Sequence, residues 1–364
     1  MKNYYTLTVL FLGLFVNAQI VTITDTNFKN QLLAADTSNN IATGIDGLSI
    51  KIDTNNNNEI EVAEALQVSE LYVYNSNIAN LTGIVAFSNL TVLECWGNQL
   101  TNLNLSGLSN LEYLDCRESQ ISDLNLTGLT SLRAIECGVN QLTSLNLAGL
   151  DLEGLVCEVN QIQSLDLSQQ TNLQVLQCDS NQLTTLDLSG LKQIYYLICN
   201  SNLFTTLDVS NMPLLDTFVF NSNPNLTTVN LKNGSIETFV EFDDNPSLVG
   251  LCADAGQITQ IQDLVTLYNL SNCSVSSDCA LNTNNFANSD SFKIYPNPVN
   301  SILNFEFSND VKIYSITVYN ILGQLILKSL NAYENLDVSS LKTGNYWIKI
   351  NTDQGITNAK FIKL

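Results

Sequence analysis

Six cysteines recur at a near-constant interval and are the first residues in the chain that suggest chemistry. Accessible thiolates act as nucleophiles, exchange disulfides or bind soft metal ions. Each of these cysteines stands two residues after a Leu or Ile, and this alternation places both side chains on one side of a short strand. Because buried Cys behaves as a small hydrophobe, we predict packed, free and unreactive thiols. We call them the ladder cysteines: Cys95, Cys116, Cys137, Cys157, Cys178 and Cys199.

Acidic residues next to three of the ladder cysteines suggest a second kind of chemistry. Glu94, Asp115 and Glu136 each stand one position before a cysteine, so they point to the opposite side of the strand. Neighbouring strands lie about 5 Å apart, which is close to the carboxyl separation in retaining glycosidases. A shallow open sheet does not desolvate a carboxyl group or raise its pKa. We therefore expect the chain not to be an enzyme.

Composition narrows the function classes further. The chain has 364 residues, a net charge of −21 and no His, which excludes His-based triads and His metal sites. The acidity disfavours nucleic-acid binding, which needs Lys and Arg against phosphates. Residues 66–250 carry nineteen Asp or Glu against four Lys or Arg, whereas residues 291–364 carry five against seven. This change in charge predicts a domain boundary between the two segments.

The N-terminal residues are typical of a signal peptide. Lys2 supplies the positive charge, an apolar run covers residues 7–16, and Ala18 is a small residue at a plausible cleavage point. The run is too short for a membrane-spanning helix, and we expect no transmembrane segment elsewhere. We predict that residues 1–18 are removed and that the mature protein works outside the cytoplasm, where disulfides persist.

The thiols and carboxylates belong to a repeat, L-x-x-L-x-C-x-x-N-x-L-x-x-L-x-L-x-x-L, that occurs about nine times. Val73 and Phe220 replace the thiol in outer units, and Ser119 replaces the Asn of one unit. One unit cannot bury its own apolar face, so stacked units must share a continuous interior. We expect the Asn side chains to bridge buried backbone amides between coils. Those Asn residues are Asn98, Asn140, Asn160, Asn181 and Asn202.

The pattern resembles the leucine-rich-repeat family over about half the chain, residues 68–251. The resemblance implies a solenoid with a parallel β-sheet on its concave face. Twenty or twenty-one residues per coil leave little room for a helix on the convex side, where we expect short 3₁₀ or extended segments near residues 103–105 and 145–147.

Residues that flank the ladder positions should line the concave sheet. The first three coils gather aromatic rings, acids and one Arg there, a combination that suits a protein partner or a sugar ring. The alternative is a solvated sheet with incidental aromatics. The candidate binding residues are Tyr72, Tyr74, Glu94, Trp96, Tyr113, Asp115 and Arg117.

The segment before the repeats, residues 19–67, should form an N-terminal cap. Its stretch DTNNNNEIEVAE, residues 53–64, resembles an EF-hand calcium loop, with Asn58 where Gly is usual. The resemblance implies Ca²⁺ held by Asp53, Asn55, Asn57, the carbonyl of Glu59 and the closing Glu64. The alternative is an Asn-rich surface turn before a short helix.

Residues 252–279 should form the C-terminal cap, with a helix in GQITQIQDLVTLYNL. Cys252, Cys273 and Cys279 lie off the ladder spacing, and three cysteines allow one bridge with one left over. The closing SSDC resembles the end of leucine-rich-repeat domains, which implies a Cys252–Cys279 disulfide.

A polar linker, residues 280–290, precedes short alternating runs that predict about seven strands of a small β-sandwich over residues 291–364. The stretches YPNP, NILGQ, LKTGNYWIKI and KFIKL resemble the C-terminal sorting domain of the Por, or type IX, secretion system. The resemblance implies a Bacteroidetes-type source and a translocon partner. It also implies Sec export, outer-membrane translocation and an extracellular or surface-attached location.

The sequence therefore predicts a secreted or cell-surface leucine-rich-repeat protein that binds another protein or mediates adhesion. The alternatives are a polysaccharide-binding surface protein, through Trp96 and its Tyr neighbours, and a structural surface component. We expect an unknown protein or glycan ligand, no nucleic-acid partner, and no cofactor besides Ca²⁺.

Overall fold

The computed structural model describes residues 19–279, 292–307, 312–320, 324–329, 335–352 and 355–364, without the side chains of 355–358. It divides into two compact units, Met1–Asp278 and Cys279–Leu364, which we describe separately. The predicted signal peptide and linker lie outside the described residues. Within the described part of the chain, no helix is long and apolar enough to cross a membrane.

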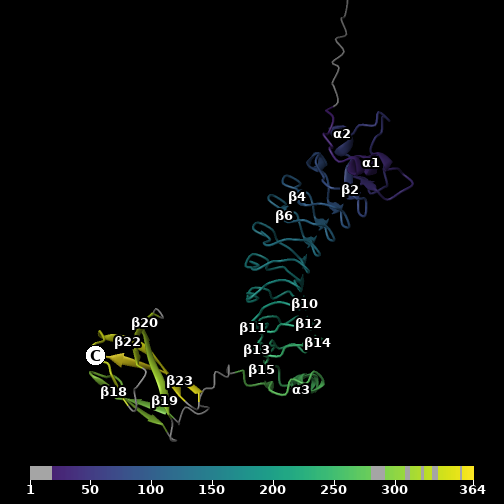
Figure 1. Ribbon diagram of the computed structural model, residues 1–364. Coiled ribbons are helices and arrows are strands. Elements are labelled where there is room, and N and C mark those ends of the chain that lie inside the picture. Colours follow the sequence, from purple (N-terminus) through teal and green to yellow (C-terminus); the bar gives the residue numbers. More distant parts are fainter. Residues whose placement is uncertain (1–18, 280–291, 308–311, 321–323, 330–334, 353–354) are drawn as a thin grey trace, which may run out of the picture. The chain divides into compact units, whose positions relative to one another are not determined.

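The first unit is a solenoid whose coils stack one after another between a cap bearing helices α1 and α2 and a cap bearing α3 (Figure 1). A ten-stranded sheet runs along it; β1 pairs antiparallel with β2, and every later pair is parallel. The strands, in sheet order, are β1 (Ala42–Gly44), β2 (Val68–Tyr72), β3 (Val92–Glu94), β5 (Tyr113–Asp115), β7 (Ala134–Glu136), β8 (Gly154–Val156), β9 (Val175–Gln177), β10 (Tyr196–Ile198), β12 (Thr217–Val219) and β14 (Phe239–Glu241). The predicted leucine-rich-repeat solenoid is thus confirmed.

The repeat strands after β2 have three residues each, and the central one turns inward. The central Leu, Ile, Phe or Val is buried, and the residue just after the strand, which we call the ladder position, is buried too. All six ladder cysteines are free and have no exposed surface. At the C-terminal end Phe220 and Phe242 take this position, and Phe242 packs edge-on against Tyr268 with ring centroids 5.2 Å apart. The interior therefore widens from thiols to phenyl rings toward the second cap.

The other side of the solenoid is extended. Short strands form a two-stranded sheet and a four-stranded sheet there, and the 3₁₀ helix assigned among the described residues, η1 (Ile84–Ala86), lies before the second repeat strand. Near residue 103 the chain is an extended strand, one of the two forms that we expect there. Residues 145–147 lie in neither a strand nor a 3₁₀ helix. These strands are β4 (Asn102–Asn104), β6 (Asp123–Asn125), β11 (Thr206–Asp208), β13 (Thr228–Asn230), β15 (Gly250–Cys252) and β16 (Ser274–Ser276).

Asparagines three positions after the ladder position tie successive coils together. The Asn160 side-chain amide donates to the carbonyls of Cys137 at 3.1 Å and Cys157 at 3.2 Å, and its oxygen accepts the Leu142 N–H at 2.9 Å. Asn98, Asn140, Asn181, Asn202, Asn223 and Asn245 bond in the same way. At the interrupted coil the buried hydroxyl oxygen of Ser119 has no hydrogen-bond partner among the described residues.

Both ends of the interior are covered. At the N-terminal end, α1 (Thr26–Ala34) buries Phe28 and Leu32. The short helix α2 (Val62–Ala65) begins within the last residues of the predicted calcium loop. At the C-terminal end, α3 (Ile258–Leu267) buries Ile261. Cys252 and Cys279 are disulfide-bonded, and Cys273 is free.

The second unit packs two antiparallel sheets around a small core. Seven strands are assigned among its described residues, in the orders β17-β18-β21 and β20-β19-β22-β23. Val318, Ile348 and Phe361 are buried between the sheets. The strands are β17 (Phe292–Tyr295), β18 (Ile302–Phe307), β19 (Ile313–Asn320), β20 (Leu325–Ser329), β21 (Asn335–Asp337), β22 (Gly344–Thr352) and β23 (Gly355–Lys363).

Candidate functional site

The outward side of the ten-stranded sheet, which we call the sheet face, gathers the predicted binding residues. Parallel, in-register pairing places Tyr72 beside Glu94, Glu94 beside Asp115, and Asp115 beside Glu136. Residues one position beyond the ladder add a second row, which contains Tyr74, Trp96 and Arg117. The register therefore brings all seven predicted residues onto three neighbouring coils.

Two aromatic rings form a platform at the start of this surface. The rings of Tyr74 and Trp96 are stacked, with centroids 4.8 Å apart and planes 11° from parallel. Tyr74 is exposed and Trp96 is partly exposed. An accessible, nearly coplanar ring pair offers a rigid apolar surface at low entropic cost, which is typical of anchor residues in protein interfaces.

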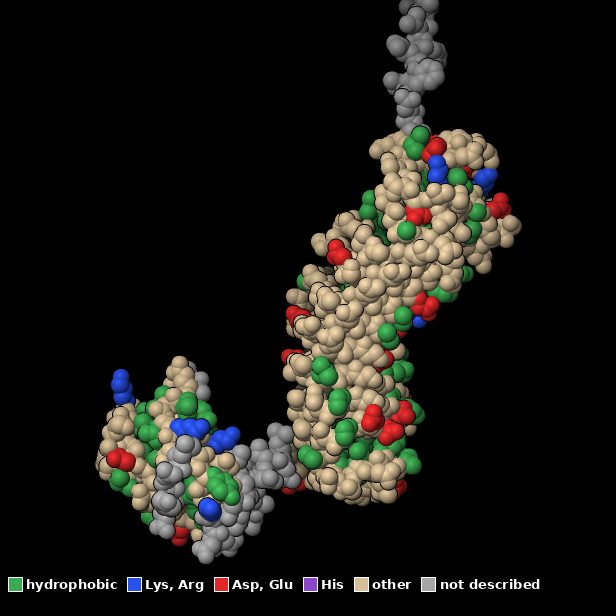
Figure 2. All heavy atoms as spheres, viewed as in Figure 1, with side chains coloured by type: hydrophobic (Ala, Val, Ile, Leu, Met, Phe, Trp, Pro, Cys, Tyr) green, Lys and Arg blue, Asp and Glu red, His purple; other side chains and the backbone are tan. Residues whose placement is uncertain are grey.

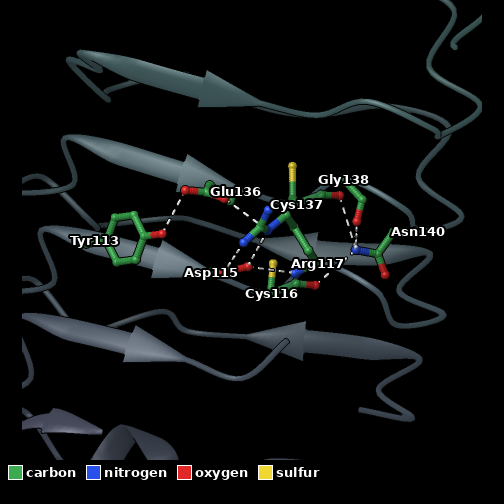
Figure 3. A network of polar contacts seen from close by, with 8 residues as sticks. All are labelled: Tyr113, Asp115, Cys116, Arg117, Glu136, Cys137, Gly138 and Asn140. Atoms are coloured by element: carbon green, nitrogen blue, oxygen red, sulfur yellow. Dashed lines mark hydrogen bonds and ion pairs between the residues drawn. The ribbon is translucent and has the colours of Figure 1, made fainter. Parts of the chain in front are cut away.

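A polar network centred on Arg117 adjoins the platform (Figure 3). The guanidinium bonds both carboxylate oxygens of Asp115, at 3.0 and 2.8 Å, and its Nε lies 2.9 Å from Glu136 Oε2. Tyr113 donates its hydroxyl to Glu136 Oε1 at 2.7 Å. The hydrogen bonds that Arg117 donates to Asp115 raise the pKa of Arg117, and burial together with Glu136 raises the pKa of Tyr113. The network therefore holds four side chains in fixed positions.

One predicted residue is not available to a ligand. We expected Asp115 to face solvent, but it is only 2% exposed. The reason is local: Arg117, two residues further along, folds back over it and forms a two-pronged ion pair. Asp115 therefore positions Arg117. Because Arg117 holds both Asp115 and Glu136, this pair does not offer the free acid and base that a glycosidase needs.

Tyr72 is fixed in a similar way at the N-terminal edge of the surface. Its hydroxyl donates to Glu70 Oε2 at 3.0 Å. Burial, with help from Glu70, raises the pKa of Tyr72 to about 12. The ring edge of Tyr72 stays partly exposed beside Glu94.

Glu158 and Asp179 continue the second row, one position beyond the ladder, and were not among the predicted site residues. The Glu158 carboxylate lies over Gly138, where an added Cβ would come within 2.4 Å of three of its atoms. Glu158 Oε2 and Asp179 Oδ1 are buried and lack a hydrogen-bond partner among the described residues. Burial, followed by the charge of Asp179, raises the pKa of Glu158, whereas Arg117 acts in the opposite direction. The signal in the sequence was the Gly, which leaves room for a neighbouring long side chain.

In strands β8, β9, β10 and β12 the outward strand positions of the sheet face are uncharged. At the end of the sheet, Phe239 is exposed and borders a shallow hollow with Leu264, Leu267 and Tyr268 of the second cap. Hydrophobic and acidic side chains lie close together on this part of the solenoid surface (Figure 2).

The predicted calcium loop contains three buried carboxylates. Asp53, Glu61 and Glu64 are 5%, 4% and 7% exposed. Asp53 accepts the N–H groups of Asn57 and Asn58, and Glu64 accepts those of Thr54 and Glu61.

The Asn side chains of the loop do not turn their oxygens inward. Asn55 and Asn57 direct their amide nitrogens to the two Glu61 oxygens, at 3.1 and 2.6 Å. The Glu59 carboxylate pairs with Lys29 at 2.7 Å, and the predicted ligand atom of this residue, its carbonyl oxygen, takes no part in that pair. In the described part of the chain, no three acidic or thiol side chains are already arranged as a metal site.

Comparisons with known proteins address the two units separately. Residues 293–364 match the family model of the secretion system C-terminal sorting domain. No curated protein sequence matches the chain significantly.

Solved structures similar to the chain include three repeat proteins. The functional domain of InlJ from Listeria monocytogenes, which includes a cysteine ladder, is 18% identical with a TM-score of 0.32, covering 92% of this chain and 98% of that one. Internalin C2 from Listeria monocytogenes is 23% identical with a TM-score of 0.41, covering 63% and 93%. An LRR protein of Leptospira interrogans is 18% identical with a TM-score of 0.38, covering 59% and 62%. This chain is a leucine-rich-repeat solenoid followed by a secretion system C-terminal sorting domain.

Proposed function

We propose that the protein is exported through the type IX secretion system by its C-terminal domain and binds a protein partner on the first half of the sheet face. The observation that carries the binding proposal is the exposed Tyr74–Trp96 platform beside a fixed network of charged side chains. A rigid aromatic centre with a charged rim is the anatomy of a protein-interaction hot spot.

The charges indicate the chemistry of the partner. Arg117 is neutralised by Asp115 and Glu136, so Glu94 and Glu158 leave the surface negative. A partner segment with Lys or Arg side chains beside an apolar residue complements this surface, because carboxylates attract its charges and the stacked rings accept its cations.

The export proposal is tested by deleting residues 291–364 in a host that has the secretion system. We expect the truncated chain to remain inside the cell envelope, and unchanged export would refute the role of the tail. A tagged solenoid then serves as bait on the native cell surface, with Trp96→Ala as the test variant. We expect at least about tenfold weaker binding of the partner it captures, while Phe239→Ala, which removes an exposed ring from the other end of the same sheet, binds normally.

Polysaccharide binding is the competing proposal, and the coplanar ring pair is the observation that favours it. Sugar rings stack on such a platform through their apolar faces. A glycan array probed with the parent chain and with Trp96→Ala separates the two proposals. Signals that vanish with Trp96 would favour the glycan, whereas a blank array with a captured protein favours the protein partner. If neither binding changes, the surface has a structural role only.

We also propose that the 53–64 loop binds Ca²⁺, and the observation that favours it is the set of buried carboxylates of Asp53, Glu61 and Glu64. None of the three forms an ion pair with a described residue, and buried carboxylates ordinarily pair with a cation. The structure adds Glu61, which stands ninth in the loop, to the ligands predicted from the sequence. Asn55 and Asn57 would have to turn their amide oxygens toward the ion.

Thermal unfolding with Ca²⁺ and with chelator tests this proposal. A ligand at a hundredfold excess over its Kd stabilises the native state by about 2.7 kcal/mol, so we expect a clear rise in Tm. The double variant Asp53→Ala, Glu64→Ala should lose the rise, and Asp123→Ala, which removes an exposed acid outside the loop, should keep it. The same Tm with calcium and with chelator in the parent would eliminate the site.

A further inference from the structure

The C-terminal domain presents one sheet whose charge is unlike that of the rest of the chain. Strands β19, β20, β22 and β23 contain Lys328, Lys349, Lys360 and Lys363 and no Asp or Glu. Lys363 is buried, and the other three are exposed. In a protein of net charge −21, an entire sheet without a carboxylate side chain is a distinct surface. Lys side chains are visible on this domain in Figure 2.

One side of this sheet packs on the core, and the other faces outward. Ile316, Val318, Ile348 and Ile350 are buried against the other sheet. Their neighbours along each strand therefore point to the opposite side. We call that side the basic face.

Strand register places aromatic rings at the centre of the basic face. Tyr319 pairs with Trp347, and Trp347 pairs with Lys360 on the next strand. Trp347 is 51% exposed. Tyr319, Trp347 and Lys349 line a shallow hollow. A half-exposed indole in a regular strand contributes little to the core, so its packing inside the domain does not explain it.

Aliphatic and charged side chains surround the rings. Leu325 pairs with Tyr319 on the outer strand, and Ile362 lies beside Asn345 at the other edge; both aliphatic side chains are exposed. Lys349 pairs with Thr317 in the adjacent row. The surface is therefore an apolar centre with a cationic rim.

We propose that the basic face docks the sorting domain onto an acidic protein surface of the export machinery. This inference rests on the proposed export function and adds the face and the chemistry of the partner. Charge complementarity selects an acidic partner. The exposed aliphatic side chains favour a protein over a glycan, because an apolar centre with a polar rim matches the anatomy of protein interfaces.

Export of the full chain tests the proposal. In a host with the secretion system, the double variant Lys349→Glu, Lys360→Glu should lower the exported fraction about tenfold, because like charges meet across the interface. Trp347→Ala should lower it to a similar extent by removing the anchor ring. Lys293→Glu is the matched control, since Lys293 is an exposed lysine on the other sheet, and should export normally. Unchanged export of both test variants would overturn the proposal.

A folding check, a milder variant and the tail deletion distinguish the possible results of the export experiment. Circular dichroism of each purified variant checks folding, and the milder pair Lys349→Gln, Lys360→Gln should give a smaller loss of export if the reversed pair fails to fold. If deletion of residues 291–364 abolishes export while the charge reversal does not, the face is wrong and the export function stands. If the deletion leaves export unchanged, the proposed function itself fails. Normal export with loss from the cell surface would refute the acidic protein partner and assign the face to an anionic glycan.

Discussion

Strands β2 to β12 of the sheet form two halves of four strands, which have the same interior and different faces. Strands β2, β3, β5 and β7 carry four carboxylates at their outward positions, whereas β8, β9, β10 and β12 carry none. Inside, both halves bury a central Leu, Ile or Phe and then a ladder residue with no exposed surface. The repeat therefore fixes only the residues that point inward, and the outward positions are free to differ from coil to coil. A binding function is to be sought where the outward residues depart from a plain solvated sheet.

The largest effect should follow from truncating the shared interior, and it should be equal in the two halves. Leu114 and Leu197 are fully buried at equivalent positions of β5 and β10. Changing either to Ala removes buried apolar surface and leaves a cavity, so we expect each variant to lose about 3 kcal/mol of unfolding free energy. Urea unfolding followed by circular dichroism measures it. A clearly smaller loss at one position would show that the two halves do not share one kind of interior.

The next effect concerns the asparagines that join the coils. The Asn181 amide donates to the carbonyls of Cys157, Cys178 and Asp179, and its oxygen accepts the Ile162 N–H at 2.9 Å. Asn181→Ala leaves buried backbone groups without partners, so we expect a loss of about 2 kcal/mol. Exposed Asn110, whose amide bonds a single carbonyl, provides the matched control, and Asn110→Ala should cost much less. Equal losses in the two variants would contradict a bridging role.

The interior could be predicted from the sequence because one physical requirement recurs in every coil. The spacing of Leu, Cys and Asn alone identifies the buried positions and the bridging amides. The face could be predicted only in part. Asp115 was expected to be accessible, but an ion pair formed within its own strand end buries it. The position of the Glu158 side chain over Gly138 depends on contacts between coils, and strand periodicity alone does not predict such contacts.

In the C-terminal domain, too, the sequence predicts the strands but not the exposed surface. Its strands and its sorting motif were visible as alternating runs and short sequence stretches. The basic face was not, because it arises from antiparallel register that brings Tyr319, Trp347 and Lys360 side by side from three strands. Because residues far apart in the sequence form this surface, no local sequence pattern predicts it.

A smaller effect of opposite sign is expected at Ser119, where the series of bridging asparagines is interrupted in the polar half. The Ser119 hydroxyl oxygen is buried and has no partner among the described residues. Ser119→Asn should restore the bridge and raise the free energy of unfolding by about 1 kcal/mol. The exposed Ser109, which lies in the same solenoid, is the control site, where the same change should have little effect. A destabilised Ser119→Asn variant would mean that this coil lacks room for the longer side chain.

The smallest effect should be a pH dependence of the unfolding free energy that is centred on Glu158. This residue lies where the strands with outward carboxylates meet the strands without them. Burial and Asp179 raise the pKa of Glu158, Glu136 adds to the effect, and Arg117 opposes it. A carboxyl group with a raised pKa binds its proton more tightly in the folded state, so its ionisation destabilises the fold. This penalty is complete above the folded pKa and disappears as the pH falls below the ordinary value of about 4.3.

Glu158→Gln removes the ionisation, so the variant should be more stable than the parent at pH 7, and the two should converge near pH 4. Other carboxyl groups titrate in both proteins and cancel in the difference. Glu153, an exposed residue that immediately precedes β8 in the same coil, supplies the control. Glu153→Gln should show no such convergence. A difference that grows as the pH falls would reverse the sign and show that the ionised Glu158 carboxylate stabilises the coil, with Arg117 outweighing its burial.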